Sequence, residues 1–100
     1  MVRRVWLQTG DLVFRSKLRA VVESVGGELG DAGGADLLVI EAGSRGWEER
    51  VGEAVGRGVS VLAFGPHVGA DLLRRARELG AVAVPNSQVE EALRAFFRPL

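Results

Sequence analysis

The sequence predicts a single three-layer α/β domain over residues 1–100, with a five-stranded parallel sheet between two layers of helices. Short apolar runs alternate with longer segments whose apolar residues recur at helical spacing. The run 37–40 is apolar without interruption and 59–64 is largely so, which is typical of parallel strands covered on both faces. One hundred residues suffice for one hydrophobic core and not for two.

The first predicted strand and helix lie at the start of the chain. We expect a strand over 2–7 and a helix from about Asp11, whose short carboxylate suits the N-cap position. Gly26 and Gly27 then end the helix, because glycine is favoured just after a helix C-terminus. The side chains predicted to form its buried stripe are Phe14, Leu18, Val21, Val22 and Val25.

The middle of the chain is predicted to hold two further strands and a helix. Residues 28–29 leave room for only a very short strand, and the turn at 31–34 leaves no room for a helix before the strand at 35–42. A helix then begins at about Trp47 and ends at Gly58. Its inward side chains are predicted to be Trp47, Val51, Ala54 and Val55.

The last third is predicted to add two strands and two helices. We expect strands at 59–64 and 81–84, with a helix between them that ends at Leu79. The segment 87–90 matches a capping box, which makes Ser87 the N-cap of the final helix. The buried side chains predicted for these helices are Leu72, Leu73, Ala76, Leu79, Val89, Ala92, Leu93 and Phe96. Repeated strand–helix units with right-handed crossovers favour the strand order 2-1-3-4-5 with four helices.

The composition argues against several classes of function. The formal net charge is zero, so we expect neither a nucleic-acid nor a membrane partner. No apolar run reaches the length of a membrane span, and the first residues lead into a strand-like run rather than a signal peptide, so we expect a cytoplasmic location. Without cysteine there is no disulfide, thiolate metal site or thiol nucleophile. The high ratio of Arg to Lys fits a GC-rich genome, and the scarcity of Asn and Gln fits a thermophilic source.

Two segments carry a resemblance to a known family. One is Ala-Asp-Leu-Leu-Val-Ile-Glu at 35–41. The other is Glu-Leu-Gly-Ala at 78–81, followed by a strand, a proline and a helix with Glu-Glu-Ala-Leu at 90–93. With these segments the chain resembles the CheY-like receiver superfamily along most of its length, and 11–18 with 64–68 is similar to a divergent receiver-like group. The resemblance implies a flavodoxin-like fold in which the second receiver helix is missing.

The resemblance also implies which groups phosphoryl transfer requires, and this chain lacks most of them. A working receiver has an acidic pair after strand one, an accepting aspartate after strand three, a hydroxyl after strand four and a lysine after strand five. These groups neutralise and position a metaphosphate-like phosphoryl group. Lys17, the only lysine, lies in the first helix. The positions carried over form a degenerate receiver pocket of Asp11, Glu41, Gly65, His67, Pro85 and Asn86. We therefore expect a pseudo-receiver that is not phosphorylated on aspartate.

The polar residues of this pocket admit a second interpretation. Asp11, Glu41 and His67 follow the carboxyl ends of three strands, where open α/β sheets bind ligands. Two carboxylates and an imidazole can bind a divalent metal or support acid–base chemistry. Equally, Asp11 can cap a helix, Glu41 can be solvated and His67 can pack at a helix start. Because no short ligand motif accompanies them, we predict no catalytic residue, no metal and no cofactor.

The glycine-rich strand ends suggest an anion site. The candidates for it are Gly10, Gly43, Ser44 and Arg45, whose backbone N–H groups and guanidinium could reach a phosphate or nucleotide. Neither segment matches the dinucleotide fingerprint or the P-loop. Turn geometry alone explains the same glycines.

The candidates for a protein interface are Trp47, Arg74, Arg75 and Phe97. Phe97 lies beside the apolar stripe of its helix, so it is either exposed at an interface or tucked over the helix end with Pro99 and Leu100. The second predicted helix is acidic and the third is basic, which favours a homodimer or a protein partner with complementary charge. A solvated, salt-bridged surface is the alternative.

The sequence thus predicts a non-enzymatic receiver-like signalling or adaptor module that acts by protein contact with an unidentified partner. The alternative is a small flavodoxin-like domain that binds an anion, a nucleotide or a metal at its carboxyl-end loops. An enzyme that uses Asp11, Glu41 and His67 is the third hypothesis.

Overall fold

The computed structural model describes residues 2–68 and 70–98. Its elements, in chain order, are β1 (Arg4–Gln8), α1 (Leu12–Ser24), β2 (Glu28–Leu29), β3 (Leu37–Glu41), α2 (Trp47–Gly56), β4 (Ser60–Gly65), α3 (Ala70–Glu78), β5 (Val82–Pro85), the 3-10 turn η1 (Asn86–Gln88) and α4 (Val89–Phe96). All neighbouring strands pair in parallel, in the order β2-β1-β3-β4-β5. The predicted fold class and strand order are therefore confirmed.

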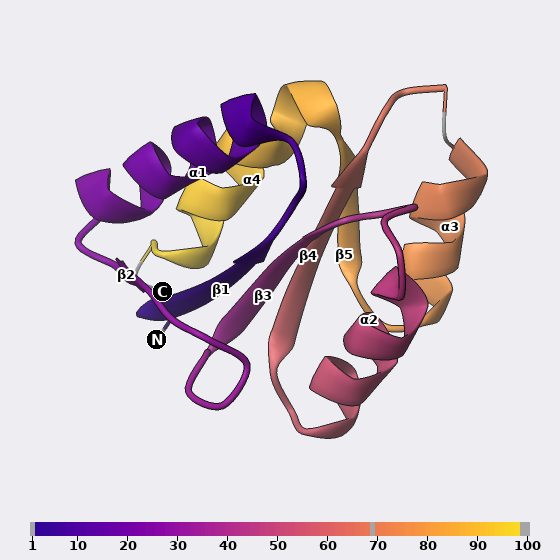
Figure 1. The fold of residues 1–100 in the computed structure, drawn as a ribbon, viewed down its shortest axis with the longest axis horizontal. Coiled ribbons are helices and arrows are strands. Elements are labelled where there is room, and N and C mark those ends of the chain that lie inside the picture. Colours follow the sequence, from indigo (N-terminus) through magenta and orange to yellow (C-terminus); the bar gives the residue numbers. More distant parts are fainter. Residues whose placement is uncertain (1, 69, 99–100) are drawn as a thin grey trace.

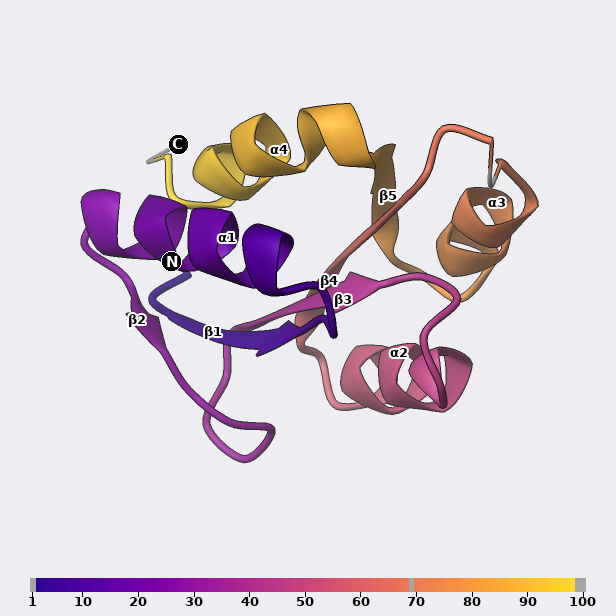
Figure 2. The ribbon, with the colours of Figure 1, turned by 45° about the horizontal axis from the view of Figure 1, so that its top comes forward.

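The helices cover the two faces of the sheet in pairs. α1 and α4 lie together on one side, and α2 and α3 lie on the other (Figures 1 and 2). Each side has its own apolar cluster, because successive side chains of a strand point to opposite faces. In β3, Leu38 and Ile40 join the cluster under α2 and α3, whereas Leu37 and Val39 join the one under α1 and α4. All four are fully buried, as expected for a central parallel strand.

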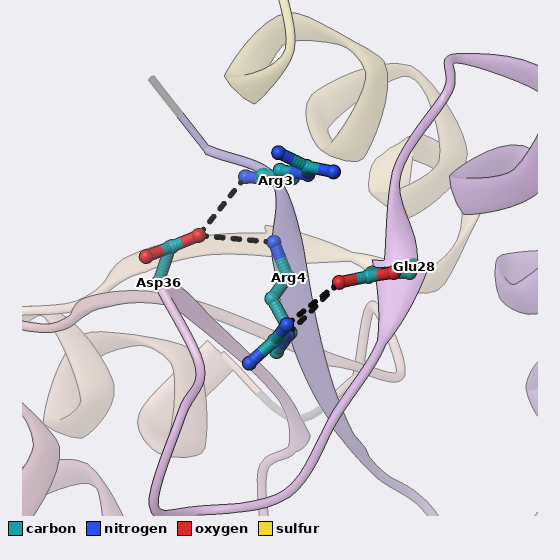
Figure 3. Close-up of polar contacts among 4 residues, drawn as sticks. All are labelled: Arg3, Arg4, Glu28 and Asp36. Carbon is teal, nitrogen blue, oxygen red and sulfur yellow. Dashed lines mark hydrogen bonds and ion pairs between the residues drawn. The ribbon is translucent and has the colours of Figure 1, made fainter.

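No helix lies between β2 and β3. In this region of the fold, side chains from β1 and β2 make contacts beside the loop that joins β2 to β3. Trp6 of β1 packs against the cluster beneath α2 and α3. Arg4 extends over the loop, where a Cβ added to Gly30 would lie 2.5 Å from its Cγ and Cδ. The Arg4 guanidinium binds one oxygen of Glu28 through Nε at 3.1 Å and Nη2 at 2.9 Å (Figure 3). The hydrogen bond to Glu28 and the charge of Glu28 raise the pKa of Arg4.

Asp36 joins the start of β3 to the start of β1. Its Oδ2 accepts hydrogen bonds from the backbone N–H groups of Arg3 at 3.1 Å and Arg4 at 3.0 Å (Figure 3). Its own N–H donates to the carbonyl of Arg4 at 2.8 Å. The bonds from the Arg4 and Arg3 amides lower the pKa of Asp36 below its ordinary 3.8, because they favour the charged carboxylate.

The predicted start of the final helix is wrong. Asn86–Gln88 form a 3-10 turn and α4 begins at Val89, with Gln88 at its N-cap and no side-chain capping bond. Ser87 therefore lies within the turn and does not form the predicted capping box. Val55 also departs from its predicted inward position, since it is 37% exposed beside Gly80. No helix within residues 2–68 and 70–98 is both long and apolar enough to cross a bilayer.

Candidate functional site at the carboxyl edge of the sheet

The residues predicted for a degenerate pocket do lie along one edge of the sheet. Asp11 follows β1, Glu41 ends β3, Gly65 ends β4 and Pro85 ends β5. Because β1, β3, β4 and β5 are successive parallel strands, their carboxyl ends form one continuous edge. Gly65 and Pro85 face each other in the β4–β5 register. The edge is therefore a real feature of the fold, and its chemistry depends on how each side chain is engaged.

The Asp11 carboxylate is the N-cap of α1. Its Oδ1 accepts hydrogen bonds from the N–H groups of Val13 at 2.9 Å and Phe14 at 3.1 Å. Asp11 has extended backbone angles, as an N-cap residue requires. These two amides have no carbonyl partner inside the helix, so the carboxylate satisfies a structural need. The capping interpretation of Asp11 is confirmed.

Glu41 is bonded to Thr9, which is not among the predicted site residues. The Thr9 hydroxyl donates to Glu41 Oε1 at 2.5 Å, and the same hydroxyl oxygen accepts from the N–H of Asp11 at 3.1 Å. Glu41 is half-buried rather than freely solvated. Thr9 thus joins the end of β3 to the turn that leads into α1. Thr9 lies two residues before the N-cap residue Asp11, and this spacing is the sequence feature that could have indicated a role for Thr9 in the turn.

The ends of β4 and β5 bring neither a hydroxyl nor an ammonium group to this edge at the carried-over positions. Gly65 is buried and has no side chain, and Pro85 and Asn86 are half-buried. His67 is exposed in the turn after β4. Lys17 is exposed on α1. Among the described residues, no three His, Asp or Glu side chains lie close enough together to hold a metal ion. Asp11, Glu41 and His67 therefore do not form the ligand set that the second interpretation requires.

The loop after β3 forms part of a small pocket. Gly43 and Gly46 have φ of +90° and +73°, values that favour glycine, so turn geometry accounts for both. The Ser44 hydroxyl donates to the carbonyl of Glu41 at 2.6 Å. A pocket of about 210 Å³ lies beside this loop, lined by Gln8, Thr9, Gly10, Ser44 and Arg50. Of the predicted anion-site residues, Gly10 and Ser44 line this pocket, whereas Gly43 and Arg45 do not.

The structure removes one aromatic residue from the predicted interface. Trp47 is only 6% exposed and belongs to the cluster beneath α2 and α3. Because it points inward from the first position of α2, it offers no surface to a partner. Phe97 is half-buried, and its ring lies against Gly27, where an added Cβ would be 2.6 Å from its Cε1. Pro99 and Leu100, the predicted neighbours of Phe97, lie outside the described residues.

Arg74 and Arg75 are exposed, but both form ion pairs within the chain. Arg74 pairs with Asp71 on the same helix. Arg75 reaches across to Glu48 of α2, with Nε 3.3 Å from Oε2, and its Nη1 lies 3.7 Å from Glu78. The basic and acidic helices are neighbours on one face of the sheet, so part of their complementary charge is paired internally (Figure 1).

Comparison with known proteins supports the fold. No protein-family model and no curated protein matches this sequence. Among solved structures, the chain is similar to NtrX from Brucella abortus, in a crystal structure of that protein in complex with ADP, with a TM-score of 0.76. The match has 12% sequence identity and covers 97% of this chain but only 28% of the NtrX chain. The likeness shows the fold, which is a flavodoxin-like parallel sheet of five strands in the order 2-1-3-4-5 with four helices.

Proposed function

We propose that this chain is a non-enzymatic, receiver-like signalling module that acts by contact with another protein and is not phosphorylated on a carboxylate. The observation that carries the proposal is the engagement of both carboxylates at the carboxyl edge. Asp11 caps α1, and Glu41 accepts the Thr9 hydroxyl. Each carboxylate thus has a structural partner where phosphoryl transfer would need a metal ligand or a nucleophile.

The positions around these carboxylates support the same conclusion. Stabilising a transferring phosphoryl group needs preorganised positive charge or hydrogen-bond donors close to its oxygens. The carried-over positions of β4 and β5 hold Gly65, Pro85 and Asn86, and Lys17 lies on the exposed face of α1. A phosphoryl group at Glu41 would therefore lack the hydroxyl and the lysine that receivers place after their fourth and fifth strands.

A phosphorylation assay tests this part of the proposal. The protein is incubated with acetyl phosphate and magnesium, and its intact mass is measured over time. We expect no added phosphoryl group in the wild type. A phosphoryl group that appears on the wild type and is lost in Glu41→Gln, or in Asp11→Asn, would overturn the proposal and identify the acceptor.

The contact surface that we favour lies at the start of α1. Leu12 is 80% exposed and Val13 is 62% exposed, so two adjacent large apolar side chains are open to solvent at this end of the helix. We propose that the partner is a protein of different sequence rather than a second copy of this chain. The prediction of self-association rests partly on the charge of Arg75, and Arg75 pairs with Glu48 in the same chain. Light scattering that showed a dimer would contradict this choice.

Photo-crosslinking tests the contact surface. A photoreactive residue at position 13 is expected to capture a discrete protein in the native cell, whereas the same residue at the exposed position 57, at the end of α2, is not. Equal capture from both positions, or none from position 13, would remove α1 as the contact surface.

A further inference from the structure

We propose that the pocket between the β1–α1 and β3–α2 loops binds a tetrahedral oxyanion, and that Arg50 is the residue that recognises it. Arg50 lines the pocket together with Gln8, Thr9, Gly10 and Ser44. It is the only charged residue in that lining, and no carboxylate belongs to it. This site lies beyond the function proposed above, because a protein-contact module does not require an anion.

The structure holds the Arg50 guanidinium in place before any ligand binds. Its Nη1 donates to the carbonyl of Arg45 at 2.7 Å. The guanidinium also lies over the turn, with its Cζ 3.8 Å from where a Cβ of Gly46 would be. One N–H of the guanidinium makes this bond, and within residues 2–68 and 70–98 the others have no acceptor, so they can bind oxyanion oxygens. Because part of the entropic cost of ordering Arg50 has already been met, more of each new hydrogen bond contributes to affinity.

Two further donors in the lining can face an oxyanion. Within the described residues the N–H of Gly10 has no hydrogen-bond acceptor, and a Cβ at Gly10 would meet nothing within 4 Å. The side-chain amide of Gln8 makes only a 3.4 Å contact with the carbonyl of Leu7. The Thr9 hydroxyl donates its proton to Glu41 Oε1, so it does not donate to a ligand.

The size of the pocket limits what it can hold. Its volume of about 210 Å³ is below the roughly 300–1,000 Å³ typical of sites that enclose a whole drug-sized ligand. A nucleotide would leave its base and sugar outside, whereas a single phosphate group fits. The ligand class that we infer is therefore inorganic phosphate or the phosphate group of a small phosphomonoester.

Titration with inorganic phosphate, followed by ¹H–¹⁵N NMR at constant ionic strength, tests the site. We expect saturable shifts of the Gly10 and Ser44 amides. Arg50→Gln is expected to weaken binding by about tenfold or more, because it removes charge-assisted hydrogen bonds. The matched control is Arg45→Gln, because Arg45 does not line the pocket and the substitution keeps the backbone carbonyl that accepts from Arg50. This control is expected to bind phosphate like the wild type.

Two further comparisons make the test decisive. Arg50→Lys keeps the charge and loses the planar fork, so we expect intermediate affinity and a wild-type-like spectrum without phosphate. Glycerol phosphate that binds more tightly than inorganic phosphate identifies a phosphomonoester as the source, and the reverse order identifies the free ion. Shifts that rise linearly without saturation, or equal binding by wild type and Arg50→Gln, would overturn the proposal.

Discussion

Replacing Asp11 by alanine tests whether its carboxylate stabilises the start of α1. In Asp11→Ala the N–H groups of Val13 and Phe14 lose the acceptor that now lies 2.9 and 3.1 Å away. Replacing an N-cap side chain by alanine costs about 1 kcal/mol, with a range of roughly 0.5–2. We expect the middle of this range, because Phe14 also packs its ring 5.3 Å from that of Phe64 and so helps to hold the first turn of α1.

Equilibrium unfolding in urea measures this loss. With a denaturant dependence of about 1–3 kcal/mol/M, a loss of about 1 kcal/mol lowers the midpoint by roughly 0.3–1 M at unchanged slope. In thermal unfolding the same loss lowers Tm by about 4–8 °C for a domain near this size.

Two control variants show whether the carboxylate acts as a cap. Asp11→Asn keeps an acceptor oxygen, so we expect it to remain within a few tenths of a kcal/mol of wild type. Ser16→Ala lies exposed on the same helix, and its higher helix propensity should make it neutral or slightly stabilising. Wild-type stability in Asp11→Ala would refute the reasoning and leave this carboxylate available for another role.

Three other changes test the fold of the domain. Gly30→Ala places a Cβ 2.5 Å from the Arg4 side chain, so we expect it to destabilise the wild type and to cost much less in an Arg4→Ala background, as measured by a double-mutant cycle in urea. The lowered pKa of Asp36 means that the unfolded chain binds its proton more readily, so this stabilisation is complete above the ordinary pKa of 3.8 and is lost as pH falls through the folded-state value. The stability gap between wild type and Asp36→Asn should therefore narrow as the pH is lowered from above 3.8, and a constant gap would contradict the assignment. Phe64→Ala empties a fully buried position in β4 and should cost about 3–5 kcal/mol in the same unfolding assay.

The strand order could be predicted because hydrophobic patterning and chain connectivity determine it together. The uninterrupted apolar run of β3 marks a central strand, and the short segment between β2 and β3 has no room for a helix. The boundaries moved by one or two residues. The largest local error was at Ser87, where the capping pattern is present but the chain has already entered a 3-10 turn.

The candidate site was predicted less completely, because its contacts join residues distant in sequence. Thr9 and Glu41 are 32 residues apart, and no local pattern links them. The glycine-rich loop predicts Arg45 as the anion-binding arginine, but Arg50, on the next helix, lines the pocket. Trp47 is a candidate for the interface by residue type, whereas its helical spacing with Val51 indicates the core, where the structure places it. Side-chain direction decided these cases, and the sequence pattern alone does not specify it.

We propose that the carboxyl edge of this flavodoxin-like sheet does not support phosphoryl transfer. The most direct test of this claim is the intact mass of the wild type, side by side with Glu41→Asp, during incubation with acetyl phosphate and magnesium. We predict that both proteins keep their starting mass, because shortening the acid supplies neither a lysine nor a hydroxyl at the ends of β4 and β5. A phosphoryl group on residue 41 of the wild type would contradict the claim.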